Sequence, residues 1–248
     1  MKRFLIATLL CLVIVLSFVF VALKYVSTGP DNNSFNKNWR SKFAENPFLR
    51  RALSLHYDGD ANSDYLGPRY SRILIEVDSM EGVSIPLAAI QELVKNISAV
   101  TGKNTGFIAS DDHLVKPDLV DLRNFIMDNQ DYSSGKDRAV LHLVIVNSNE
   151  EDSSFLGKTI NDDTVVLYYD MLSEVTSRNP ELFKAYFQST ALHEFGHQLG
   201  LGHNKEEGCL MNEAVEEFTI VRQDLDEVVS TFCDFELEQI QDIKSQYN

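Results

Sequence analysis

The chain has 248 residues, of which 44% are hydrophobic and 24% charged, so it is long enough for one folded domain and an appendage. Its formal net charge is −15, and the first 24 residues carry three bases and no acid, so the remainder is more acidic still. A surface this acidic argues against nucleic acid or anionic lipid as a partner.

An apolar run opens the chain. Phe4–Leu23 carries no charge and, as a helix, would span roughly 30 Å, which is the thickness of a bilayer core. Two basic residues precede it, which favours a cytoplasmic N-terminus. We therefore expect residues 1–26 to be a single-pass signal-anchor, with residues 27–64 as a polar linker and residues 65–248 as an extracytoplasmic domain. If the first segment is cleaved, the domain is secreted.

Strand-like and helix-like patterns follow one another through the domain. The expected strands are 72–78, 105–109, 139–146 and 164–169, and the expected helices are 84–101, 117–129, one that begins near Pro180, and 224–246. The run 139–146 is almost continuously apolar, which indicates a central strand. This order predicts an α/β (α+β) fold.

The most specific pattern lies on the helix that begins near Pro180. Residues 190–203 read TALHEFGHQLGLGH, and the pattern within them comprises His193, Glu194, His197, Gly200 and His203. Two histidines four residues apart share one helix face, so both imidazoles can bind one ion. The glycine lets the chain turn so that the third histidine returns. Three imidazoles with an open fourth position predict one catalytic Zn²⁺.

The motif resembles that of the metzincin clan of zinc metallopeptidases, and Met211 is placed for the clan's Met-turn. The resemblance implies a twisted mixed sheet, a long zinc-binding helix and a small C-terminal subdomain. It also implies that Glu194 is the general base and that the methionine forms an apolar floor beneath the zinc. Both the archaemetzincin and the matrixin branches fit a minimal catalytic domain of this kind.

In that clan an antiparallel edge strand pairs with the extended substrate. The candidate here is 154–158, which includes Phe155, Leu156 and Gly157. The alternative is that residues 147–163 form only a mobile acidic loop.

Cys209 and Cys233 are the two cysteines outside the apolar run. Outside the cytoplasm a disulfide is the default for such a pair. The archaemetzincin branch implies an alternative, the remnant of a second, structural zinc site built from four cysteines. Two of those four thiolates are missing, because Asn204 and Glu236 stand at the other two positions.

The sequence therefore predicts a zinc-dependent metalloendopeptidase that acts as a monomer on protein or peptide substrates at the outer face of a membrane. One alternative is a catalytically silent domain that binds zinc and peptides at the cell surface. Another is an aminopeptidase of narrow specificity. The intact motif argues against the silent domain.

Overall fold

The computed structural model describes, with short internal gaps and a few isolated positions elsewhere, residues 61–109, 130–148, 155–212 and 228–247. The chain divides into two units, Met1–Tyr57 and Asp58–Asn248. Most of the expected membrane segment, and the expected linker up to residue 60 apart from Leu49, lie outside the described residues. Within the described part of the chain, no helix is both long and apolar enough to cross a bilayer.

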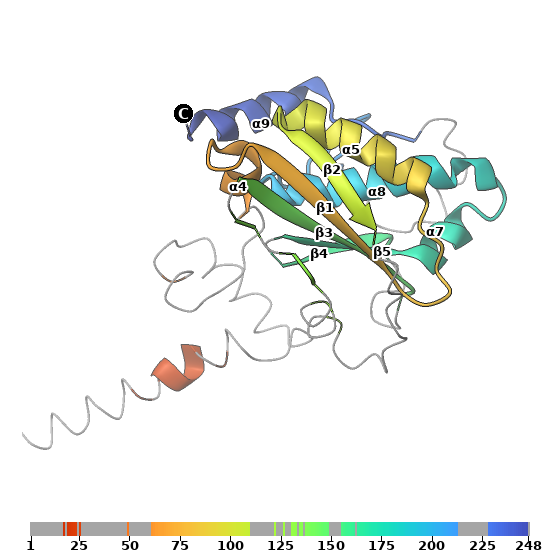
Figure 1. Cartoon of the computed structure of the whole chain (residues 1–248), viewed down its shortest axis with the longest axis horizontal. Helices are drawn as coiled ribbons and strands as arrows, with labels where there is room; N and C mark the ends of the chain where they lie inside the picture. Colours follow the sequence, from red (N-terminus) through yellow and green to blue (C-terminus); the bar gives the residue numbers. More distant parts are fainter. Residues whose placement is uncertain are drawn as a thin grey trace, which may run out of the picture. The chain divides into compact units, whose positions relative to one another are not determined.

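A five-stranded mixed sheet is the frame of the second unit (Figure 1). Its strands are β1 (Arg72–Ser79), β2 (Asn104–Ala109), β3 (Arg138–Val146), β4 (Gly157–Asn161) and β5 (Thr164–Tyr168). The spatial order is β2-β1-β3-β5-β4, and β4 alone of these runs antiparallel, against β5. The predicted central strand is confirmed, since β3 occupies the middle of the sheet and is buried from Ala139 onward.

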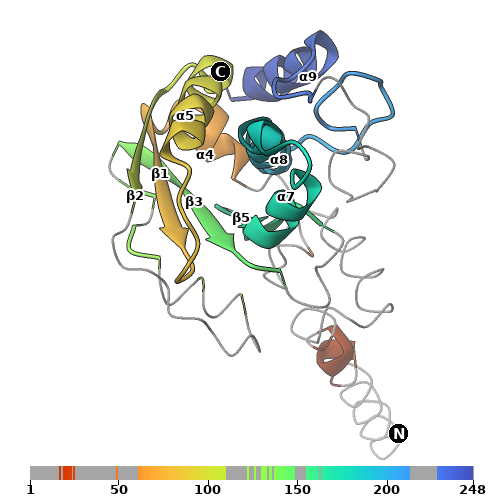
Figure 2. The same cartoon turned by 90° about the vertical axis from the view of Figure 1, so that its right-hand side faces the viewer.

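Helices α5 and α8 lie on one face of this sheet (Figures 1 and 2). The second unit contains α4 (Asn62–Leu66), α5 (Leu87–Thr101), α7 (Tyr169–Val175), α8 (Phe183–Gln198) and α9 (Asp234–Ser245). A 3-10 turn at Pro180–Leu182 leads into α8, so the α-helix itself begins three residues after the expected proline. The predicted helix 117–129 lies outside the described residues except for Leu122 and Ile126.

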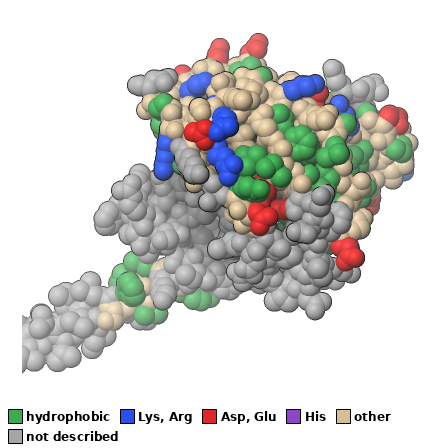
Figure 3. Space-filling view, in the orientation of Figure 1, with side chains coloured by type: hydrophobic (Ala, Val, Ile, Leu, Met, Phe, Trp, Pro, Cys, Tyr) green, Lys and Arg blue, Asp and Glu red, His purple; other side chains and the backbone are tan. Residues whose placement is uncertain are grey.

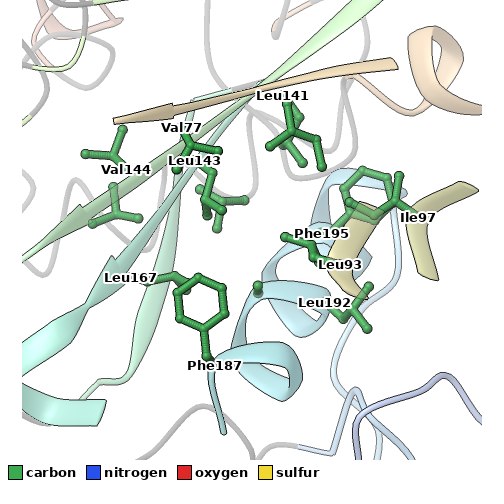
Figure 4. Close-up of a cluster of buried hydrophobic side chains, with 14 of the residues drawn as sticks. Val77, Leu93, Ile97, Leu141, Leu143, Val144, Leu167, Phe187, Leu192 and Phe195 are labelled. Carbon is green, nitrogen blue, oxygen red and sulfur yellow. The ribbon is translucent and has the colours of Figure 1, made fainter. Parts of the chain in front are cut away.

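The core fills the space between the sheet and these two helices (Figure 4). Leu141, Leu143 and Leu167 come from the strands, and they meet Phe187 and Phe195 of α8. Every residue of α8 from 187 to 198 is buried, because the helix has the sheet on one side and the C-terminal segments on the other. The first two histidines of the motif therefore sit on a helix that the core holds in place.

The C-terminal helix differs from its prediction. We expected it to span 224–246, but α9 begins at Asp234 and the described residues 228–233 are not helical. The chain is extended at Cys233, whose backbone N–H donates to the Glu236 carboxylate in a capping box, so the helix begins there. The apolar positions of this segment divide between the two sides, because Ile240 is fully buried whereas Phe235 is 47% exposed, and Glu236 is fully buried.

The edge strand also differs from its prediction. We expected it at 154–158, whereas β4 begins at Gly157. Gly157 lies close against α8: a Cβ added to it would be only 2.7 Å from Thr190 Cγ2. An edge strand antiparallel to its neighbour is thus present, three residues later in the chain than expected.

Candidate metal centre

Three histidine side chains converge beside the C-terminal end of α8. His193 and His197 lie one turn apart on the helix and are 0% and 8% exposed, and His203 lies in the segment that follows. The Nε2 atom of His203 is 3.1 Å from Nε2 of His193 and 3.1 Å from Nε2 of His197. Ligands in a tetrahedral site with Zn–N bonds of about 2.05 Å are separated by about 3.3 Å. The three ring nitrogens therefore have the spacing that one zinc ion requires.

Backbone carbonyls set the tautomers of the two helix histidines. His193 Nδ1 is 2.8 Å from the carbonyl oxygen of Leu210, and His197 Nδ1 is 2.9 Å from that of Leu201. A carbonyl can only accept, so each Nδ1 carries a proton and donates it. Each Nε2 then presents a lone pair toward the shared point, which is the usual arrangement of zinc-binding imidazoles. The residues present fit a zinc ion.

The turn after α8 explains how His203 reaches this point. Gly200 has φ of 95°, a conformation that favours glycine. Its N–H donates to the His197 carbonyl at 2.9 Å, and the Leu201 N–H donates to the Gly196 carbonyl at 3.0 Å. These two bonds form a Schellman motif, which ends the helix and reverses the chain. The same turn brings the Leu201 carbonyl to His197 Nδ1.

Glu194 follows His193 on α8 and is 1% exposed. The Thr159 hydroxyl, from β4, is 2.9 Å from Oε2 of the Glu194 carboxylate, and it also lies 3.2 Å from the Glu194 main-chain oxygen. A hydroxyl donates to a carboxylate, so the edge strand holds this side chain directly. Nothing in the sequence points to Thr159, because no local pattern relates it to a residue 35 positions further along the chain.

The residues predicted to pair with the substrate lie at the start of β4. Leu156 is 4% exposed and its carbonyl accepts from the Tyr168 N–H at 2.9 Å, so pairing with β5 reaches one residue beyond the strand. Phe155 is partly buried against the core, and Gly157 packs on α8.

Met211 lies against the backbone of α8 and is fully buried. A Cβ added at Gly196 would be only 2.4 Å from the methionine Sδ. Gly196 stands directly before His197, so the methionine packs on α8 between its two candidate ligands, His193 and His197. The metzincin resemblance implies that a methionine packed in this way forms an apolar floor beneath the metal.

A disulfide joins Cys209 to Cys233, with Cα atoms 5.1 Å apart. Glu236 lies beside it, and its carboxylate accepts from Asn204 Nδ2 at 2.9 Å. The four positions that hold cysteines in the archaemetzincin branch therefore do meet in this chain. Two of them form a disulfide and two form a carboxylate–amide pair, so no thiolate is left among them to bind a second zinc.

A second buried group of polar side chains lies on the sheet. His142 of β3 is 2.7 Å from an oxygen of Asp78, and Glu76 accepts from the backbone N–H groups of Asp131 and Tyr132 at 2.7 and 3.2 Å. Burial raises the pKa of the Glu76 carboxyl above its ordinary value. These contacts link β1, β3 and the segment before β3, which favours a structural role for His142.

No histidine is visible on the face shown in Figure 3, where acidic and basic side chains both occur.

The chain resembles archaemetzincins in sequence. The profile of Peptidase family M54 matches residues 120–242, just under half of the chain. Archaemetzincins from two strains of Saccharolobus islandicus, L.S.2.15 and Y.N.15.51, are each 34% identical over 79 residues. That stretch is 31% of this chain and 40% of each relative, so the match covers less than half of the relatives' own length.

The similarity in fold to an archaemetzincin covers more of the chain than the similarity in sequence does. The crystal structure of archaemetzincin from Methanopyrus kandleri matches with a TM-score of 0.52 and 18% identity, covering 72% of this chain and 98% of that chain. At this identity the likeness concerns the fold alone. The chain is therefore similar to archaemetzincins in sequence over part of its length, and it shares their fold over most of it.

Proposed function

We propose that this protein is a zinc-dependent endopeptidase. The observation that carries the proposal is the convergence of three Nε2 atoms at zinc spacing, with Nδ1 of the two helix histidines held by backbone carbonyls. Zinc held there by His193, His197 and His203 would supply a Lewis acid that lowers the pKa of a bound water to about 7.

Glu194 is the general base in this proposal. Its carboxylate follows the first zinc ligand on α8 and is held by the Thr159 hydroxyl. It accepts the proton of the attacking water and later delivers a proton to the leaving amine. Because the carboxylate is buried and held in one place, little reorganisation is needed when the proton moves.

The edge strand β4 supplies the substrate-binding surface. Among the described strands β4 pairs with β5 alone and lies at the end of the sheet order, and in this proposal its outer edge binds an extended peptide. Main-chain pairing along such an edge binds peptides with little dependence on their sequence. Phe155, Leu156 and Gly157 begin this surface, and Thr159 connects it to the general base.

The proposed location is the outer face of a membrane, with the protein held by a single pass. The uncharged run Phe4–Leu23 supports the anchor. The Cys209–Cys233 disulfide supports an oxidising compartment for the domain. Resistance of the protein to extraction by alkaline carbonate would test the anchor, and release of a soluble, shortened chain would favour secretion.

The function is tested with purified full-length protein, a peptide library and a chelator. The wild type is expected to hold one zinc per chain and to cleave within peptides, and Glu194→Ala should keep the zinc and lose hydrolysis. Full activity in this variant, or in chelated protein, would refute the proposal. Zinc bound without any cleavage by the wild type would identify a silent binding domain, and cleavage only after the first residue would identify an aminopeptidase.

A further inference from the structure

Glu236 of α9 is a buried carboxylate that the hydrolytic mechanism does not use. It is 0% exposed and accepts four hydrogen bonds. Three come from backbone N–H groups, those of Cys233 at 3.0 Å, Leu210 at 3.1 Å and Met211 at 2.6 Å, and the fourth comes from the Asn204 side chain at 2.9 Å. All four groups are donors, so both oxygens of the side chain act as acceptors, as they do in a carboxylate. A negative charge is therefore placed directly behind the Met-turn.

One peptide unit connects this charge to the zinc centre. The Met211 N–H and the Leu210 carbonyl belong to the same peptide group, at opposite ends of its dipole. The N–H donates to Glu236 Oε1 at 2.6 Å, and the carbonyl accepts from His193 Nδ1 at 2.8 Å. Hydrogen bonds in a chain of this kind polarise one another. The carboxylate thus makes the Leu210 carbonyl a stronger acceptor for the imidazole.

We propose that Glu236 is a positioning residue of the zinc site, which acts through the Leu210–Met211 peptide to orient His193 and to strengthen it as a ligand. The inference rests on the zinc site of the proposed function. Carboxylates that hydrogen-bond metal-binding imidazoles orient the ring and raise its basicity. Here the peptide group stands between the carboxylate and the ring and transmits the same effect.

The two helix histidines are not equivalent in this respect. His197 Nδ1 donates to the Leu201 carbonyl at 2.9 Å. The N–H of that peptide belongs to Gly202, and no carboxylate among the described side chains accepts from it. His197 therefore serves as an internal reference for His193 within the same protein.

Glu236 also caps α9 and fastens the Met-turn, so its role toward zinc must be separated from a merely structural one. The test uses the full-length protein with its disulfide intact and compares Glu236→Gln with Asn204→Ala. The first variant keeps the shape of the side chain and removes the charge. The second removes one donor to the same carboxylate and leaves the charge and both Met-turn bonds in place.

The measurement is the zinc dissociation constant, obtained by competition with a chromophoric chelator, alongside the melting temperature of the zinc-free protein. Glu236→Gln is expected to weaken zinc binding roughly 10- to 100-fold, the range found when partners of metal ligands are lost. Asn204→Ala should stay close to the wild type. An unchanged dissociation constant in folded Glu236→Gln, or an equal loss in both variants, would overturn the inference.

A second measurement needs no variant. In the zinc-loaded wild type, the Nδ1–H proton of His193 should resonate further downfield in NMR spectra than that of His197, because its acceptor is the stronger one. Equal shifts, or the reverse order, would contradict the inference. If the wild type itself bound no zinc in the chelator competition, the proposed function would fail, and this outcome is distinct from a failure confined to Glu236.

Discussion

Replacing Gly196 by alanine tests the contact between α8 and the Met-turn. The added Cβ would lie 2.4 Å from Met211 Sδ and 3.1 Å from a ring carbon of Phe232. Met211 is fully buried, and its backbone is held by Glu236, so it has little room to move. We expect this overpacking to lower the free energy of unfolding by about 3 kcal/mol, the upper end of such effects. Alanine's higher helix propensity offsets about 1 kcal/mol of this.

The net loss of stability is therefore about 2 kcal/mol, which corresponds to a fall in Tm of about 4–8 °C for a domain of this size. Calorimetry and urea unfolding of the zinc-free protein measure it without a contribution from bound metal. Gly202→Ala is the matched control in the same region, because a Cβ there meets nothing within 4 Å. If Gly196→Ala were as stable as the wild type, or no less stable than the control, the proposed packing of Met211 on α8 would be refuted.

Three further perturbations follow from other contacts. Thr159→Val removes the hydroxyl that holds the Glu194 carboxylate, so kcat should fall roughly tenfold, as expected from losing a hydrogen bond to a charged group, while KM and zinc affinity stay unchanged. Thr159→Ser should restore kcat, and an unaltered kcat in the valine variant would rule out this role. Burial raises the pKa of Glu76 above 4.5, so the folded state binds its proton more tightly than the unfolded state does. The stability that this protonation confers is fully present below pH 4.5 and is lost as the pH rises through the raised pKa of Glu76. In urea unfolding, the free energy of unfolding of the wild type should therefore fall over this range, and it should fall less in Glu76→Gln. The exposed Glu81→Gln serves as its control, and equal pH dependence in all three proteins would contradict the prediction. Replacing Cys209 and Cys233 together by serine opens a loop with a sequence separation of 24, and the chain-entropy relation predicts a loss of about 3.5 kcal/mol in unfolding free energy. A double variant as stable as the oxidised wild type would show that the disulfide does not fasten the C-terminal segment.

The parts of the structure that could be predicted were those with a local signature. The spacing of His193, Glu194 and His197 follows from helix geometry, and Gly200 marks the turn that brings the third histidine back. The apolar run of β3 indicated a central strand because only a strand covered on both faces is apolar at successive positions. In each case neighbours in the sequence carried the information.

The parts that could not be predicted depend on contacts between distant segments. Thr159 reaches Glu194 only because β4 docks along α8. The burial of Glu236 has no signature in the sequence, since a charged residue on an amphipathic helix is usually exposed. Glu236 can be buried because its carboxylate accepts from the backbone N–H groups of Leu210, Met211 and Cys233. That contact also sets which face of α9 is inward, so Phe235 is exposed against its apolar pattern.

X-ray absorption at the zinc edge of the purified protein tests the central claim most directly. The convergence of His193, His197 and His203 predicts one zinc per chain with three imidazole nitrogens at about 2.0–2.1 Å and a water oxygen as the fourth ligand. Absence of stoichiometric zinc, or a spectrum dominated by sulfur ligands at about 2.3 Å, would contradict it.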